Sequence, residues 1–201
     1  ESSAGVLSLR SNSTHEGALL TTSGAGRLQF DSGIHTIAAN TIIQTPNEIT
    51  IRGSADVIFN VDPANFQASG KLIITSNGEA IINTDITLAG LELSAGGQVR
   101  SAANIEVTGD VDWLDTTFGF TNSSDPLRGS ATVEGHLNIT APVGQSRFVH
   151  GNYGLIAAGT ASFTGGGSLS LSTAFGVGTG SFENRGTMTI EDDSSVGGAD
   201  S

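Results

Sequence analysis

The sequence predicts an all-β protein, folded as a right-handed parallel β-helix (a β-solenoid). Apolar residues alternate with polar ones in short runs, glycine or asparagine follows most runs, and no segment keeps a 3.6-residue period over the length of a helix. Glycine, with 28 residues, and small polar residues replace charged ones, which make up only 14% of the chain. These residues are poor helix formers, so the composition also disfavours helices.

The predicted strands each have one apolar and one polar face, as expected when one side of a strand is buried. In chain order they cover 5–9, 48–52, 56–61, 71–75, 79–83, 104–108, 131–134, 136–140, 168–172 and 187–190. Turn signals separate them, and we expect glycine to supply a positive φ at these corners. The signals lie at Gly53, Gly70, Asn77-Gly78, Gly90, Gly96-Gly97, Gly109, Gly135 and Gly165-Gly166-Gly167.

Many short strands with glycine turns fit a sandwich or barrel as well as a solenoid. Three features favour the solenoid. The polar face of the strands consists of Thr, Ser, Asn and Glu throughout, aromatic residues are only 5%, and an Asn-x-Gly pattern at 152–154 returns at 184–186. Stacked coils would align like charges, which favours neutral side chains, and Asn can pass its amide along a stack. We expect residues 1–201 to form a single β-solenoid segment.

One stretch, at about 110–130, breaks this rhythm. It contains Trp113, the single tryptophan, then Phe118 and Phe120, and a polar loop from Thr121 to Asp125 before Pro126. We expect an irregular or looped coil here, and a local cap over the stack is favoured over a binding site.

The charge of the chain excludes several classes of partner. The formal net charge is −12 and Lys71 is the single lysine, so the surface repels phosphate backbones and anionic membranes. No run approaches the roughly 20 apolar residues of a spanning helix, so we expect neither nucleic-acid binding nor membrane insertion.

The first residues lack a signal-peptide pattern, and a chain that begins at Glu1 is predicted to be a mature or excised piece. The absence of cysteine excludes disulfides, thiolate catalysis and Cys-based zinc sites.

Catalysis needs separate consideration, because polysaccharide lyases and hydrolases also use β-helices. The best acidic cluster is Asp110, Asp112 and Asp115, of which the first two would share a strand face. No basic residue lies between Arg100 and Arg128 to assist them. We predict solvent-exposed carboxylates here, with no catalytic residues, no metal site and no cofactor.

The four histidines are far apart in the sequence and show no metal-ligand spacing. No nucleophile-elbow motif accompanies them, and we predict that they are surface residues of the ladders. They are His15, His35, His136 and His150.

The order of motifs from Asn104 onward resembles a repeat of very large bacterial surface proteins. The segments that carry the resemblance are 107–113 (VTGDVDW), 129–139 (GSATVEGHLNI), 152–154 (NYG), 165–171 (GGGSLSL) and 182–190 (FENRGTMTI). Trp113 departs from the pattern, since Leu-Asp follows it instead of Thr-Gly-Gly. The first hundred residues are similar only in general style to filamentous-haemagglutinin-like adhesins and autotransporter passengers. The resemblance implies an exported stalk, adhesin or filament protein, and it transfers no catalytic residues.

The sequence therefore predicts a non-enzymatic, extracellular or cell-surface structural protein: a stalk, an adhesin segment or a filament subunit. Its predicted partners are copies of itself or flanking repeats of a longer chain, stacked end to end on the unpaired strands of each end. The alternative is a carbohydrate-binding or carbohydrate-cleaving β-helix that contacts surface glycans. The candidate glycan-binding residues are Trp113, Phe118, Phe120 and Tyr153.

Overall fold

The computed structural model describes residues 5–114, 118–121, 129–172, 179–191 and 193–198. These residues form 26 β-strands and one 3₁₀ turn, η1 (Pro63–Asn65), so the all-β prediction is confirmed. Every strand pair is parallel and joins one coil to the next, which makes the chain a parallel β-solenoid. No helix in the described part of the chain is long and apolar enough to span a bilayer.

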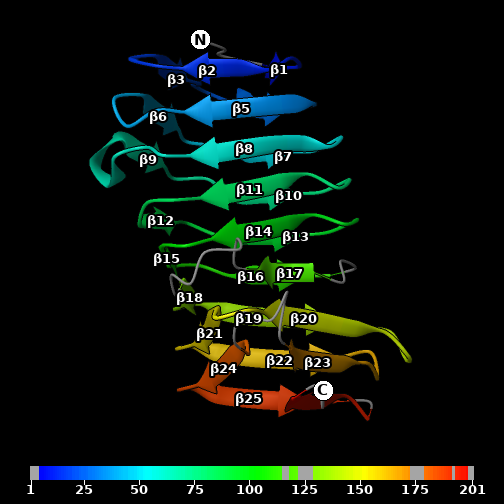
Figure 1. Ribbon diagram of the computed structural model, residues 1–201. Coiled ribbons are helices and arrows are strands. Elements are labelled where there is room, and N and C mark those ends of the chain that lie inside the picture. The colour runs from blue at the N-terminus through cyan, green and yellow to red at the C-terminus, as the bar shows by residue number, and fades with distance from the viewer. Residues whose placement is uncertain (1–4, 115–117, 122–128, 173–178, 192, 199–201) are drawn as a thin grey trace.

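The first sheet runs the whole length of the solenoid (Figure 1). Its nine strands are β1 (Val6–Leu9), β4 (Arg27–Phe30), β7 (Ile49–Ile51), β10 (Leu72–Ile74), β13 (Leu91–Leu93), β16 (Val111–Trp113), β19 (His136–Thr140), β22 (Thr160–Thr164) and β25 (Thr187–Ile190).

The second sheet also has nine strands and faces the viewer in Figure 1. They are β2 (Ser13–His15), β5 (Gly33–Ile37), β8 (Ala55–Phe59), β11 (Glu79–Ile82), β14 (Gln98–Ser101), β17 (Phe118–Thr121), β20 (Ser146–His150), β23 (Ser168–Ser172) and β26 (Ser195–Gly198).

The third side is divided into two separate sheets. The upper one consists of β3 (Leu19–Thr21), β6 (Ile42–Thr45) and β9 (Phe66–Ala68). The lower one consists of β12 (Ile86–Leu88), β15 (Asn104–Val107), β18 (Ser130–Val133), β21 (Gly154–Ala157) and β24 (Ser181–Asn184). No strand pairing joins β9 to β12 in this described region, so the third side is interrupted where η1 enters the coil.

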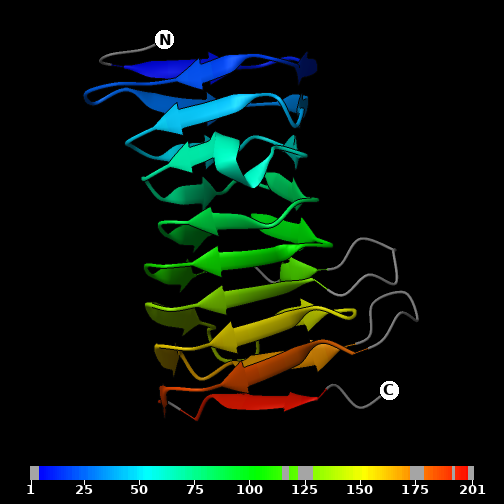
Figure 2. The same ribbon diagram turned by 90° about the vertical axis from the view of Figure 1, so that its left-hand side faces the viewer.

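The coil is right-handed, as expected for parallel strands joined by crossovers. In Figure 1 the chain passes leftward along the front sheet, around the left side, back along the rear, and downward from the N- to the C-terminal end. Figure 2 views the third side, whose strands run from right to left.

The core is a set of apolar columns that run along the axis. The alternation seen in the sequence sends every second residue inward, and parallel register stacks it on its counterpart in the next coil. One column of the first sheet contains Leu28, Ile49, Leu72, Leu91, Val111, Leu137 and Ala161, and all seven are buried. The polar face of the same strands points outward, as predicted.

Glycines form another column, at the corner that leads into the first sheet. Gly109, Gly135, Gly159 and Gly186 lie on one another there, and a Cβ on Gly186 would overlap the carbonyl oxygen of Gly159. None of the four has a positive φ. The expectation that corner glycines are needed for a positive φ is therefore wrong for this column, where close approach of the backbones is the reason.

Coil length varies while register does not. Leu72 pairs with Leu91, so one coil covers 72–90, whereas Ala161 pairs with Met188 and closes a longer coil over 161–187. The longer coil has longer strands, five residues in β23 against four in β11, and more residues between its strands. The Asn-x-Gly pattern is therefore no repeat of the coil, because its copy at 152–154 leads into β21 of the third side and its copy at 184–186 leads into β25 of the first sheet.

The predicted irregular coil at about 110–130 is described only in part. β16 and β17 take their places in the first and second sheets, and the β17–β20 register shifts between Phe118 and Phe120. Residues 115–117 and 122–128, which include Asp115 and the predicted polar loop, lie outside the described residues.

Candidate functional site

Two of the predicted glycan-binding residues are core residues. Trp113 faces inward from β16, is 0% exposed, and stacks between Leu93 and Ile139 of the neighbouring coils. Tyr153 is also 0% exposed, and its ring packs against Gly129, where an added Cβ would lie 2.9 Å from Tyr153 Cε2. Neither ring offers a face to a glycan at this surface.

The other two candidates, Phe118 and Phe120, lie on β17. Their side chains are outside the described part of the structure, and the prediction for them remains a prediction.

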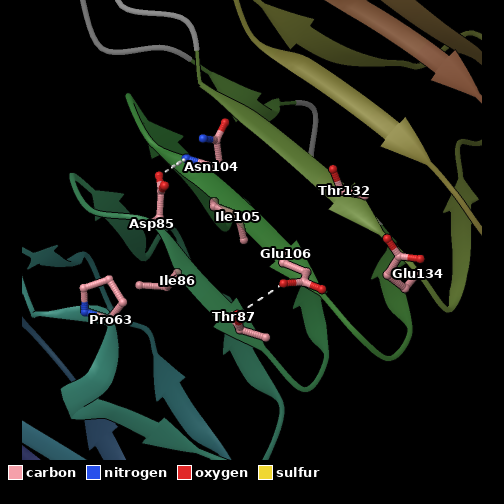
Figure 3. Close-up of a pocket in the computed structure, with 9 residues that line it drawn as sticks. All are labelled: Pro63, Asp85, Ile86, Thr87, Asn104, Ile105, Glu106, Thr132 and Glu134. Carbon is pink, nitrogen blue, oxygen red and sulfur yellow. Dashed lines mark hydrogen bonds between the residues drawn. The ribbon is translucent and has the colours of Figure 1, made fainter.

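The structure contains a groove that the sequence did not indicate. It is an open depression of about 410 Å³ on the third side, beside the interruption between β9 and β12 (Figure 3). Residues of η1, β12, β15 and β18 or their flanks line it: Pro63, Asp85, Ile86, Thr87, Asn104, Ile105, Glu106, Thr132 and Glu134.

The groove presents acceptors and hydroxyl groups on its surface. Asp85 Oδ1 accepts a hydrogen bond from the backbone N–H of Asn104 at 2.8 Å, and the Thr87 hydroxyl donates to Glu106 Oε2 at 3.4 Å (Figure 3). The Glu134 side chain is exposed at one end of the groove. The described lining includes no lysine, arginine or histidine. The arrangement suits a ligand with hydroxyl or cationic groups, and it lacks an imidazole that could serve as a base.

The acidic cluster of the sequence has a basic partner after all. Lys71 lies two coils away, and its Nζ is 2.7 Å from Asp112 Oδ2 and 4.0 Å from Glu92 Oε2. The hydrogen bond from Lys71 to Asp112 raises the pKa of the lysine. Asp110 accepts a hydrogen bond from the backbone N–H of His136 at 2.8 Å. Asp110 and Asp112 therefore stabilise the stacking of the coils. Lys71 was not recognised as their cation because it lies far from them in the sequence.

A second charged cluster joins the first three coils. Asp31 lies between Arg10 and Arg52, with Arg10 Nε 3.0 Å from Oδ2 and Arg52 Nε 2.6 Å from Oδ1. The Ser8 hydroxyl, which donates to the same carboxylate, lowers the pKa of Asp31 most. The two guanidinium groups lower it further, to about 2. An alternating ladder of charges replaces the neutral ladder that was predicted.

The histidines differ in their surroundings. His136 lies on the outer face and contacts Thr160 Oγ1 at 2.7 Å and Ser162 Oγ at 2.9 Å, as a surface ladder residue would. His150 is half-buried, and burial lowers its pKa. The prediction is wrong for His35, which is 0% exposed and points into the core, with His15 stacked on it. Ser13, His35 and Val57 share one inward column.

Arg147 is a buried cation that sequence reasoning missed. It points inward from β20, and its guanidinium donates to the carbonyl oxygens of Thr140 at 2.9 Å and Leu114 at 2.5 Å. It therefore ties together two coils at the corner between the first and second sheets. No group of three or more His, Cys, Asp or Glu side chains within the described ranges is arranged to hold a metal ion.

Comparisons of the chain with protein-family models, with curated proteins and with solved structures find no match. The resemblance to bacterial surface repeats therefore remains a prediction, and the β-solenoid fold is what the coordinates establish.

Proposed function

We propose that this chain is a non-enzymatic structural module of an exported, cell-surface protein, acting as a stiff acidic spacer. The observation that supports this is the pair of nine-stranded sheets, which run from one end to the other around a continuous apolar core. At about 4.8 Å per coil, nine strands give a rod about 40 Å long. In a solenoid each coil contacts only its neighbours, so such a module acts as a spacer of fixed length and needs no specific ligand to do so.

The partners that fit this role are copies of the chain or flanking coils of a longer chain, stacked end to end. The last described coil presents Ile190, which is 50% exposed, and half-buried Met188 in the inward columns of the first sheet. Leu7 and Leu9 occupy the same two columns in the first described coil and are likewise only partly buried. A coil placed on either end would continue these columns and pair the open strand edges.

Electron microscopy and sedimentation over a range of concentrations test the self-stacking form of this proposal. We expect rods longer than about 40 Å at high concentration. Met188→Lys, which places a charge in the inward column, should abolish the long rods. Thr189→Lys, its outward neighbour on β25, is the matched control and should keep them. Short rods at every concentration would leave only stacking on flanking coils of a longer chain.

A second candidate function is glycan binding, favoured by the groove at β12, β15 and β18. A glycan array followed by calorimetry tests it, with Glu106→Gln as the variant. Glu191→Gln is the control, because Glu191 is exposed and does not line the groove. Binding that Glu106→Gln weakens and Glu191→Gln leaves unchanged would assign the groove to glycans. No retention and no turnover on any glycan would remove the candidate.

A further inference from the structure

The interior of the first two described coils contains a polar chain in place of the usual apolar column. Ser13 and His15 of β2 and His35 of β5 all face inward, and His35 is completely buried. Ser13 Oγ lies 2.9 Å from His15 Nε2 and 2.8 Å from His35 Nδ1. The two imidazole rings stack with centroids 6.0 Å apart and planes 20° from parallel.

A backbone carbonyl determines where the protons of this chain lie. His35 Nε2 is 2.9 Å from the carbonyl oxygen of Ser32, which can only accept, so Nε2 carries the proton. In the neutral ring Nδ1 is then an acceptor, and it accepts a hydrogen bond from the Ser13 hydroxyl. Ser13 Oγ in turn accepts from His15 Nε2–H. Each of these polar atoms is satisfied while both rings are neutral.

No carboxylate in the described part of these coils compensates a charge on the rings. Phe30 packs in a T-shaped arrangement against both of them, at centroid distances of 5.0 Å to His35 and 6.4 Å to His15. The titratable groups of the surrounding strands and corners are engaged elsewhere or directed outward. Asp31 binds Arg10 and Arg52, Arg27 binds Glu48, Glu16 is exposed, and Asp56 lies on the outer face of β8.

A proton added to one of these imidazole rings must therefore destabilise the hydrogen-bonded group of Ser13, His15 and His35. Burial lowers the pKa of His15 most, and the neighbouring His35 lowers it further. Since the unfolded segment takes up a proton at about pH 6.5 and the folded one at a lower pH, acid favours the open form. This contribution to stability is present above about pH 6.5 and is lost as the pH falls through the pKa of the folded state.

We propose that Ser13, His15 and His35 form a pH-sensitive latch between the first two coils. At neutral pH the latch holds β2 on β5, and in mild acid a proton taken up by His15, whose ring stacks on buried His35 with centroids 6.0 Å apart, opens it. Opening separates β2 from β5 and exposes the backbone edge of β5, while the coils beyond it stay folded. This inference does not depend on the function proposed above.

Hydrogen exchange measured by mass spectrometry on the intact chain tests the latch at pH 7.5 and pH 5.0, after correction for intrinsic exchange rates. We expect the protection of β2 and β5 to fall several-fold in acid, because the open form takes up a proton more readily than the folded one. β11 and β14 should change little, because 79–101 contains no histidine. Equal protection of β2 and β5 at both pH values would overturn the proposal.

Two variants copy the next residue of each column. His35→Val matches Val57 and His15→Ile matches Ile37, and together they should remove the pH response of β2 and β5. His136→Asn changes an outward-facing histidine and should keep it. A response that survives in the double variant would assign the effect to other groups. If the double variant does not fold, NMR titration of the unmodified chain decides: the His15 ring signals must titrate where the β2 and β5 amides lose protection, and titration without that loss overturns the latch.

Discussion

Lys71 and Asp112 are 41 residues apart in the chain, and their side chains meet at 2.7 Å across two coils. The lysine precedes β10 and lies two residues before Ile73, and Ile73, Glu92 of β13 and Asp112 of β16 share one ladder position. Stacking thus places two carboxylates next to one another, and the one lysine of the chain compensates both.

Removing Lys71 should leave the repulsion between the Glu92 and Asp112 carboxylates uncompensated. Lys71→Met leaves Glu92 beside Asp112 without a cation, and we expect a loss of about 1 kcal/mol of unfolding free energy, as for a partly exposed ion pair. Urea unfolding at low and high salt measures it, and salt should reduce the loss. Asp112→Asn in the same background should restore part of the stability. An unchanged midpoint at low salt would show that solvent already screens the pair. Because the pKa of Lys71 is raised in the folded chain, its contribution is complete below about pH 10.5 and is lost as the pH rises further.

Asp31 should make the first coils sensitive to strong acid. Its pKa is about 2 in the folded chain, so its contribution is present above about pH 3.9 and is lost as the pH falls toward 2. Asp31→Asn should lower the unfolding free energy at pH 7 by about 1–2 kcal/mol and flatten the pH dependence between 4 and 2. Thermal unfolding along this pH series is the measurement. Asp193→Asn, at an exposed corner, is the control and should keep the wild-type slope.

The glycine corner should tolerate no side chain. Gly186→Ala places a Cβ on the carbonyl oxygen of Gly159, and we expect a loss of about 2–4 kcal/mol, because backbone must shift to make room. Gly197→Ala, which meets no atom within 4 Å, should cost far less. Calorimetry compares the two. Equal melting temperatures would mean that the corner is free to move apart.

Trp113 should report on the core. As the single tryptophan, buried between Leu93 and Ile139, it should emit at short wavelength in the native chain and shift to long wavelength on unfolding. Trp113→Ala should lower the unfolding free energy by about 3–5 kcal/mol. A native emission at long wavelength would contradict the burial and return Trp113 to the list of surface candidates.

The alternation of apolar and polar residues predicted ten of the 26 described strands, and the polar outer faces and scarce aromatic residues favoured the stacked fold. Runs such as 71–75 state which side chains face inward, and the columns follow once the coils are stacked. The side chains that meet across coils could not be predicted, because their pairing depends on how long each corner is. Lys71 meets Asp112 only because Leu91 closes the coil that begins at Leu72 and Val111 closes the next one. Local sequence does not reveal where a coil closes.

The groove was unpredictable for a related reason. It exists where the pairing between β9 and β12 is missing, beside η1, and neither Pro63 nor Glu106 carries a signal of that gap. His35 was placed wrongly at the surface because no strand was predicted over 33–37. In this strand Ile34 is exposed and His35 is buried, the reverse of what their side-chain types suggest.

The corners vary in length while the strands stay in register, so one whole coil is the unit that can be deleted or inserted. Residues 72–90 span one turn of the coil, because Leu91 takes the place of Leu72 in the column. Excising them would bring Leu91 onto Ile49 and leave the remaining columns aligned, whereas removal of a few residues within a strand would misalign every column beyond the cut. The length of such a rod can therefore change by whole coils, and each coil changes it by about 4.8 Å along the axis.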